Sequence, residues 1–191
     1  MKNIFIIVGH PSKKSFSNQI GEAYMKGAKS SGNRVKIVYL SELDFDPNLK
    51  EGYNKSQPLE KDLVLVQKHI LWANHIVIVT PVWWGSVPAK FKGLLDRALL
   101  PGFAFKYERR SLLPKQLLKG RSGIIFLVMG GSRLFHFGAF AFPGMILRRF
   151  VFNFTGVSPV RVKNFYSMSS LSEKRAKKIL DNVFKIGRRA N

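Results

Sequence analysis

The sequence predicts an α/β fold in which helices cover both faces of a single parallel sheet. Three observations support this class. The length of 191 residues suits one domain. A hydrophobic content of 46% is enough to build a full core. Short apolar runs typical of strands alternate with longer helical patterns. We therefore expect residues 1–191 to form one domain.

The predicted strands are short and rich in Ile, Val and Phe. The first reads KNIFIIV, and a continuous apolar run of this kind is typical of a parallel strand covered on both faces. The five predicted strands are residues 2–8, 34–39, 75–80, 121–129 and 159–164. Their alternation with helices implies a parallel sheet with right-handed crossovers.

The predicted helices lie between these strands and after the last one. They cover residues 15–31, 59–73, 88–100, 138–155, with a break near Pro143–Gly144, and 172–188. Gly32 ends the first helix, Pro88 is tolerated in a first turn, and Ser172 is a suitable N-cap. Pro47, Gly52 and Asn54 mark residues 45–57 as a loop.

Five strands fit the flavodoxin-like order 2-1-3-4-5, with helices on both faces of the sheet. A dinucleotide-binding Rossmann domain usually has six strands and a glycine fingerprint after the first. Here the corresponding turn reads GHPSKKSFSN, which lacks G-x-G-x-x-G. The sequence therefore favours the flavodoxin-like arrangement.

Composition excludes several kinds of chemistry. The chain has no cysteine, so disulfides, thiolate metal ligands and a cysteine nucleophile are excluded. Its four histidines show no metal-ligand spacing, and we expect no metal centre. The apolar run Ile4–Val8 is too short for a signal peptide. Residues 134–154 are apolar but contain Arg148 and Arg149, which favours a buried or interface helix over a membrane span. A soluble cytoplasmic protein is expected.

The net charge is +21, from 32 Lys and Arg against 11 Asp and Glu. Such a field attracts anions of any kind, including phosphates, acidic lipid and nucleic acid. No basic-aromatic motif resembles a nucleic-acid recognition signature, so we expect no specific nucleic-acid partner. A solvated basic surface and a peripheral contact with an anionic membrane both remain open.

The predicted ligand site lies at the carboxyl ends of the strands. In open α/β sheets, ligands bind where the strand order reverses, which for order 2-1-3-4-5 is between the first and third strands. The loops at this edge are Gly9–Asn18, Thr80–Pro88 and, nearby, Met129–His136. These stretches have the least ordinary composition in the chain.

Each loop suggests part of a ligand. Serines and Lys13–Lys14 at the start of the first helix favour a phosphate, although ordinary capping explains the serines equally well. Trp83–Trp84 followed by Gly85 favours an aromatic wall for a planar ligand. Gly130–Gly131 permits close backbone approach or a plain turn. Together the loops predict a site for a flat aromatic ring carrying phosphate, which a flavin matches.

Three segments carry a family resemblance. They are the GH-x4-SFS turn over Gly9–Ser17, the block PVWWGSVPAKFKGLLDRALLPGFAFKY over Pro81–Tyr107, and the MGGS turn over Met129–Ser132. The chain resembles the family of NAD(P)H:quinone oxidoreductases, which also includes ancillary subunits of potassium-efflux systems. The middle block is the most specific of the three, and the resemblance covers essentially the whole chain.

The resemblance implies an enzyme and its cofactors. It implies a homodimer with flavin, either FMN or FAD, in clefts at the subunit interface. It also implies a ping-pong cycle in which NAD(P)H reduces the flavin and leaves before a quinone-like acceptor takes the electrons. By position, the residues at the phosphate end are His10, Ser15, Phe16 and Ser17, and those along the ring are Pro81, Val82, Trp83, Trp84, Gly85, Met129, Gly130 and Gly131. The resemblance leaves Lys92–Gly93 structural, together with a buried Asp96–Arg97 ion pair.

One departure concerns the catalytic residues. Quinone reductases of the animal type carry a Tyr and a His after the Gly-Gly turn. Counting from Gly131, these positions fall on His136 and Phe142, so the pair is not preserved. His136 is either a catalytic donor near developing negative charge or a structural residue. The nearby phenylalanines 135, 137, 140 and 142 either shape an apolar acceptor pocket or pack at a dimer interface.

Two other functions fit parts of the sequence. An electron-carrying flavodoxin usually presents an acidic face to its partners, and the basic charge of this chain argues against it. A regulatory or ancillary flavoprotein subunit at a membrane transporter would use the basic surface to dock.

Overall fold

The computed structural model contains a five-stranded parallel sheet. It describes residues 1–53, 55, 57–108, 111, 113–138 and 143–190, without the side chains of 136–138. The strands are β1 (Asn3–Val8), β2 (Arg34–Tyr39), β3 (His75–Pro81), β6 (Ser122–Val128) and β7 (Val160–Phe165). Their order is β2-β1-β3-β6-β7. Since β6 and β7 are the fourth and fifth predicted strands, the predicted order 2-1-3-4-5 is confirmed.

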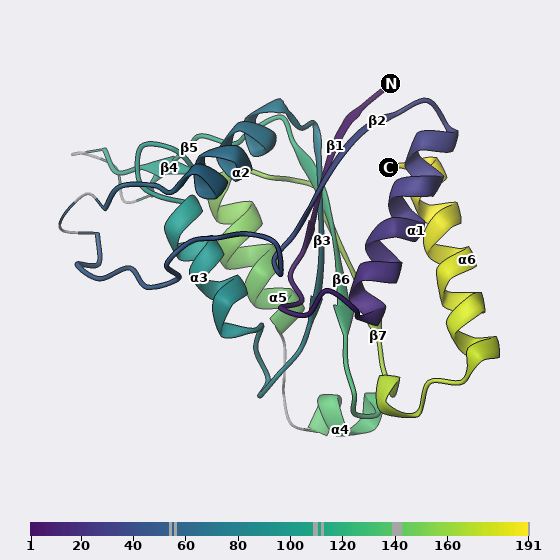
Figure 1. Cartoon of the computed structure of the whole chain (residues 1–191). Coiled ribbons are helices and arrows are strands. Elements are labelled where there is room, and N and C mark those ends of the chain that lie inside the picture. Colours follow the sequence, from purple (N-terminus) through teal and green to yellow (C-terminus); the bar gives the residue numbers. More distant parts are fainter. Residues whose placement is uncertain (54, 56, 109–110, 112, 139–142, 191) are drawn as a thin grey trace.

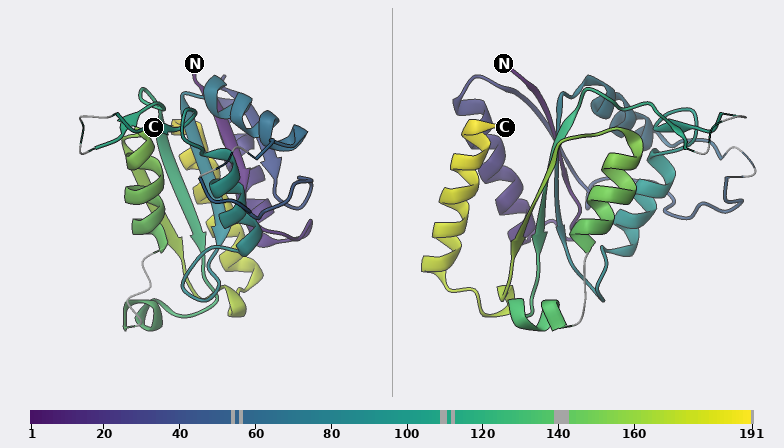
Figure 2. Two further views of the ribbon diagram at one scale, coloured as in Figure 1. Left: turned by 90° about the vertical axis from the view of Figure 1, so that its left-hand side faces the viewer. Right: turned by 180° about the vertical axis from the view of Figure 1, so that it is seen from behind.

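Helices cover both faces of this sheet, as predicted (Figure 1). One layer consists of α1 (Phe16–Ser30) and α6 (Glu173–Arg189). The other contains α2 (Lys61–Trp72), α3 (Ala89–Ala98), α5 (Pro143–Ile146) and the π-helix η1 (Leu147–Asn153). The short α4 (Arg133–Gly138) lies beyond the end of the sheet, and η2 (Met168–Ser170) is a 3-10 turn before α6. Figure 2 shows the same three layers from two further directions.

The first strand has the two-sided burial that its apolar run predicts. Ile4, Ile6 and Val8 belong to the core beneath α1 and α6, whereas Phe5 and Ile7 belong to the core beneath α2 and α3. All five are at most 3% exposed. Because successive side chains alternate between the faces of a strand, a strand covered on both sides is apolar throughout.

The structure departs from the predicted elements in two places. A short antiparallel pair, β4 (Phe105–Lys106) and β5 (Lys115–Gln116), was not predicted, because two-residue strands leave no periodic pattern. The described part of the helix predicted over residues 138–155 is the short α5 from Pro143 followed by the π-helix η1, and residues 139–142 lie outside the described residues. Within the described residues, no helix has the length and hydropathy needed to span a bilayer.

The predicted ion pair between Asp96 and Arg97 is wrong. Asp96 instead accepts a hydrogen bond of 2.7 Å from the Lys92 ammonium one turn earlier. Arg97 is completely buried and donates to the carbonyls of Asp46 and Pro58 and to the Glu60 carboxylate. Adjacent residues on a helix point in different directions, whereas residues four apart share a face, which explains the difference.

Arg97 holds α3 against the long loop between β2 and α2. The backbones approach closely there, because a side chain at position 93 would collide with Pro47. Gly93 therefore permits the contact and Arg97 secures it. Both residues have a structural role, as predicted for Lys92–Gly93.

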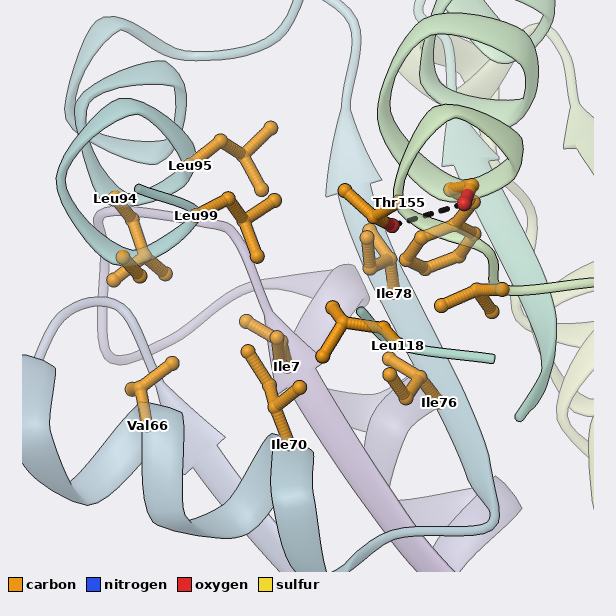
Figure 3. A pocket seen from close by; sticks show the side chains of 13 residues that line it. Ile7, Val66, Ile70, Ile76, Ile78, Leu94, Leu95, Leu99, Leu118 and Thr155 are labelled. Carbon is orange, nitrogen blue, oxygen red and sulfur yellow. Dashed lines mark hydrogen bonds between the residues drawn. The ribbon is translucent and has the colours of Figure 1, made fainter. Parts of the chain in front are cut away.

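A small apolar cavity lies in the core between the sheet and the α2–α3–η1 layer (Figure 3). Its volume is about 20 Å³, which is enough for one water-sized sphere. Its one polar lining side chain, Thr155, donates to the carbonyl oxygens of Val151 and Phe152. A cavity of this size cannot hold a planar cofactor, so the ligand site must lie elsewhere.

His75 is a buried ionisable residue at the start of β3. Its ring is fully buried, with Nδ1 2.7 Å from the Ser122 hydroxyl and Nε2 without a hydrogen-bond partner among the described residues. Burial, assisted by the positive charges of Lys2 and Arg161, lowers the pKa of His75 to about 4. The ring is therefore neutral in the folded protein at neutral pH.

This burial predicts a pH-dependent loss of stability. Between pH 6.5 and 4 the unfolded chain binds a proton at His75 that the folded chain does not. The free energy of unfolding therefore decreases as the pH falls through this range. From pH 7 to 4, the wild type should lose about 3 kcal/mol more of its free energy of unfolding than His75→Leu. Urea denaturation across this range measures the difference. The same pH dependence in both proteins would contradict the expectation.

Candidate functional site

The carboxyl ends of β1 and β3 lie next to each other at one edge of the sheet. The strands are parallel neighbours, with Val8 opposite Val79 in the register. From this edge the chain passes from β1 into α1 on one face and from β3 into α3 on the other (Figure 1). The two loops therefore separate at the point where the strand order reverses, as the sequence predicts for a ligand site.

The first two loops meet through their aromatic rings. The rings of His10 and Trp83 pack edge to face, with centroids 5.7 Å apart. The Nδ1 atom of His10 accepts the backbone N–H of Ser12 at 3.0 Å, which places the proton of the neutral ring on Nε2. Burial lowers the pKa of His10, so the ring is neutral near pH 7. His10 therefore has an N–H group available as a donor at this edge.

At the start of α1, the predicted serines have different roles. Ser15 is the N-cap: its hydroxyl accepts the N–H of Asn18 at 3.2 Å and donates to the Asn18 side chain at 2.6 Å. Ser17 is 1% exposed, and its hydroxyl has no hydrogen-bond partner among the described residues. A buried hydroxyl without a partner is costly. Ser15 thus caps the helix, whereas the Ser17 hydroxyl forms no hydrogen bond with the described residues.

The second loop is a tight turn that presents both tryptophans. The backbones of Trp83 and Ser86 exchange hydrogen bonds of 2.8 and 2.9 Å. Trp84 and Gly85 form the corner with positive φ angles of 51° and 72°. Trp84 is fully exposed and Trp83 is 45% exposed, so neither plugs the core. A bulky residue at positive φ is strained, which is frequent in functional loops.

Pro81 and Val82 attach this loop to the sheet. Both are buried, and the N–H of Val82 donates to the carbonyl of Val128 at 2.9 Å. Their side chains belong to the core, so they can contribute only backbone to a ligand surface. Phe16 in the first loop similarly packs partly against the core beneath α1 and α6.

The third loop leaves space at the same edge. Met129 is buried and its N–H donates to the Phe165 carbonyl at 2.8 Å. The Gly131 carbonyl accepts the Ser167 N–H at 2.8 Å. A side chain at Gly130 would meet no atom within 4 Å. The pairing of β3 with β6 brings this loop beside the second one.

The connection between β7 and α6 supports the third loop and was missed by the sequence analysis. The Ser169 hydroxyl donates to the Gly130 carbonyl at 2.9 Å. Arg175 donates to the carbonyls of Tyr166 and Ser167. The backbone of Ser167 is left-handed, with a φ angle of 55°. The serine-rich sequence YSMSS after a fifth parallel strand was the available signal, since that strand also ends at this edge.

The predicted catalytic residue cannot be placed relative to these groups. His136 belongs to α4, but its side chain lies outside the described residues, as does that of Phe137. Residues 140 and 142 also lie outside the described residues. Phe135 is 65% exposed on α4. The roles proposed for His136 and the phenylalanines remain predictions.

The described residues at this edge fit a flavin. The buried hydroxyl of Ser17 and the first N–H groups of α1 suit a phosphate, which helix N-termini favour. Trp83 supplies an accessible aromatic surface, and Gly130 leaves room for close approach. Over the described residues, no cluster of three or more His, Cys, Asp or Glu side chains is arranged to hold a metal ion.

Comparisons with known proteins identify the family of this chain. A family model described as the flavodoxin-like fold matches residues 2–186. A Haemophilus influenzae protein named an uncharacterized NAD(P)H oxidoreductase is 30% identical over 185 residues, which cover 94% of this chain and 91% of that protein. The Mus musculus ribosyldihydronicotinamide dehydrogenase [quinone] is 26% identical over 152 residues, which cover 69% of this chain and 64% of the mouse protein.

Solved structures show the same fold. An NAD(P)H:quinone oxidoreductase from Methanothermobacter marburgensis superimposes with a TM-score of 0.82 at 23% identity, covering 100% of this chain and 99% of that one. An FMN-dependent NADH-azoreductase from Bacillus anthracis, solved in complex with FMN, gives a TM-score of 0.75 at 21% identity, with both chains fully covered. The resemblance expected from the sequence motifs is confirmed. The chain therefore belongs to the flavodoxin-like fold family, among relatives that are named NAD(P)H oxidoreductases and quinone dehydrogenases.

Proposed function

We propose that this protein is a flavin-dependent NAD(P)H oxidoreductase that transfers a hydride from NAD(P)H, through the flavin, to a quinone-like acceptor. The observation that carries the proposal is the buried, unpartnered hydroxyl of Ser17 at the helix end facing the reversal of strand order. The names of the similar proteins support the reaction class.

The chain's own residues hold and orient the reactants. Ser17, the first N–H groups of α1 and the Nε2–H of His10 bind the phosphate end. The turn Trp83–Gly85 and the open space at Gly130 flank the ring. A bound flavin supplies the hydride and electron chemistry, so the protein needs only to position two rings and exclude competing reactions.

The order of events and the acid-base role follow from the same proposal. One pocket serves NAD(P)H and acceptor in turn, which gives a ping-pong cycle. His136 donates a hydrogen bond or positive charge where negative charge develops on the reduced ring. The flavin is FMN or FAD, because the phosphate site at α1 is common to both. The protein acts in the cytoplasm.

A homodimer completes the proposed site. The helices next to it expose large apolar side chains, among them Leu134 at 81%, Phe150 at 67% and Ile146 at 51%. Ile146 and Phe150 are four residues apart in consecutive helical turns, as expected of a contact face. Apolar surface of this kind marks protein interfaces. Sedimentation equilibrium should give twice the chain mass of 21.7 kDa, whereas a monomer at micromolar concentration would contradict the dimer.

Purification and turnover test the function directly. The protein should be yellow, or become yellow with added FMN or FAD, and it should oxidise NADPH or NADH in the presence of a simple benzoquinone. Double-reciprocal plots at several quinone concentrations should be parallel, as a ping-pong cycle requires. A colourless protein that takes up neither flavin overturns the proposal. A flavoprotein that NAD(P)H does not reduce would instead be an electron carrier.

The two serines at the start of α1 provide a matched pair of variants. Ser17→Ala should weaken flavin binding about 5- to 10-fold, corresponding to one lost hydrogen bond of about 1 kcal/mol. Stability of the flavin-free protein should not fall, because the hydroxyl has no internal partner to lose. Fluorescence titration with FMN measures the affinity.

Ser15→Ala is the control for this comparison. It removes the helix cap and should lower the free energy of unfolding by about 1 kcal/mol, with less than a threefold change in flavin affinity. If Ser15→Ala weakens flavin binding more than Ser17→Ala does, the assignment of the phosphate site to Ser17 is wrong.

A further inference from the structure

The exposed surface of α1 and α6 is strongly basic. We call the basic face the following exposed cations of these two helices: Lys26, Lys29, Lys174, Lys177, Lys178, Lys185, Arg188 and Arg189. Along both helices, every residue of which the structure describes, only Glu173 and Asp181 are exposed carboxylates. The basic face therefore concentrates positive charge on one of the two helical layers.

The side chains of these cations form no ion pair or hydrogen bond with the described residues. The ion pairs found over the described residues all lie elsewhere, on the β2–α2 loop, α3 and the β4–β5 hairpin. No side chain of the basic face donates a hydrogen bond to another described residue. Arg175, by contrast, is used internally, since it donates to Tyr166 and Ser167. The charge of the basic face is thus available to an external partner.

The charges along α6 include both like and opposite neighbours. Lys174 and Lys178 lie four residues apart, as do Lys185 and Arg189, and like charges at this spacing destabilise a helix. Glu173 and Lys177 have the same spacing, as do Asp181 and Lys185, and these opposite charges stabilise it. Cations near a helix N-terminus also oppose the helix dipole, which applies to Lys174 and Lys177. Only the cations in the last turn complement the dipole. Lys174 has no opposite charge three or four residues away and opposes the dipole, so its charge does not stabilise α6.

The two helices form a rigid layer. A side chain at Gly27 would collide with the Phe184 carbonyl, and one at Gly187 would collide with the Tyr24 carbonyl, so the backbones are in close contact. α6 has 17 residues and is therefore about 25 Å long. The layer lies on one outer side of the molecule in Figure 1 and in the right-hand view of Figure 2. Two open hollows lie on this layer. One is lined by residues that include Lys174, Lys177, Lys178 and Lys185. The other is lined by Ser31, Lys185, Arg188 and Arg189.

The apolar side of α6 is already in use. Val183 is fully buried, and Ile179, Leu180 and Ile186 pack against the core beneath α1 and α6. The helix therefore has no apolar stripe left to insert between acyl chains. Any contact with a bilayer must be electrostatic, peripheral and sensitive to salt.

We propose that the basic face docks the protein on an anionic lipid surface, with its Lys and Arg side chains on the headgroup phosphates. A broad two-helix layer with separated cations matches an array of phosphates in a plane. Each Lys or Arg near such a surface contributes about 1 kcal/mol. Neither α1 nor α6 exposes an aromatic ring on which a nucleic-acid base could stack, which favours lipid over single-stranded nucleic acid.

Vesicle co-sedimentation of the full-length protein tests this proposal. The protein should bind vesicles of equal parts phosphatidylglycerol and phosphatidylcholine at low salt, should not bind phosphatidylcholine alone, and should be released at high salt. The triple variant Lys174→Gln, Lys177→Gln, Lys178→Gln should lower the partition coefficient by roughly 100-fold, as expected for three cations at about 1 kcal/mol each.

A matched triple variant controls for net charge. Lys61→Gln, Lys68→Gln and Lys119→Gln remove three exposed charges from α2 and the turn before β6, outside the basic face. The vesicle partition coefficient of this variant should fall less than threefold. Equal losses in the two variants, or no binding to the anionic vesicles at low salt, would overturn the proposal. Tighter binding to a short DNA or RNA than to anionic vesicles would also overturn it and would identify nucleic acid as the partner.

The proposal does not depend on the proposed function. Neither triple variant alters a residue of the candidate site, so NAD(P)H oxidation should be unchanged in both. If the Lys174, Lys177 and Lys178 variant loses vesicle binding but keeps normal turnover, the proposed role of the basic face is supported independently of the enzyme. If the wild type shows no turnover, the vesicle result still stands.

Discussion

The reversal of strand order between β1 and β3 is the constraint on which the candidate site depends. Parallel pairing fixes the carboxyl ends of both strands at one edge, and the crossovers then carry the chain to opposite faces of the sheet. The loops after β1 and β3 consequently separate above the edge, while the pairing of β3 with β6 adds the glycine loop beside them. The loops of the candidate site are thus held by a scaffold whose core lies away from them.

Buried polar groups distinguish structural from functional positions in this protein. Arg97 is fully buried, and two carbonyls and the Glu60 carboxylate accept its terminal N–H groups, so it fastens α3 to a loop although its Nε has no partner among the described residues. Ser17 is equally buried and its hydroxyl has no partner among the described residues. His75 also has an unpartnered nitrogen, but it lies at the opposite end of β3 from the site and is neutral. Among the unpartnered buried groups of the described residues, Ser17 is the one at a helix N-terminus, and the proposed phosphate site is placed there for that reason.

The two helical layers have different surfaces. The layer containing α5 and η1 exposes large apolar side chains, whereas the α1–α6 layer exposes cations and uses its apolar residues internally. A charged layer on one side and an apolar surface on the other give the molecule two separate contact regions. The proposed dimer and the proposed lipid contact therefore do not compete for the same residues.

The sequence by itself determined the fold class, the strand order and the three loops of the site, because apolar runs, turn residues and the Pro81–Tyr107 block are local signals. Only the tertiary structure separated the capping role of Ser15 from the unsatisfied hydroxyl of Ser17, although both are serines two residues apart. It also replaced the expected Asp96–Arg97 pair with contacts from Arg97 to residues 46, 58 and 60. Those partners are distant in the chain, and which groups a buried side chain meets depends on packing that no local pattern records.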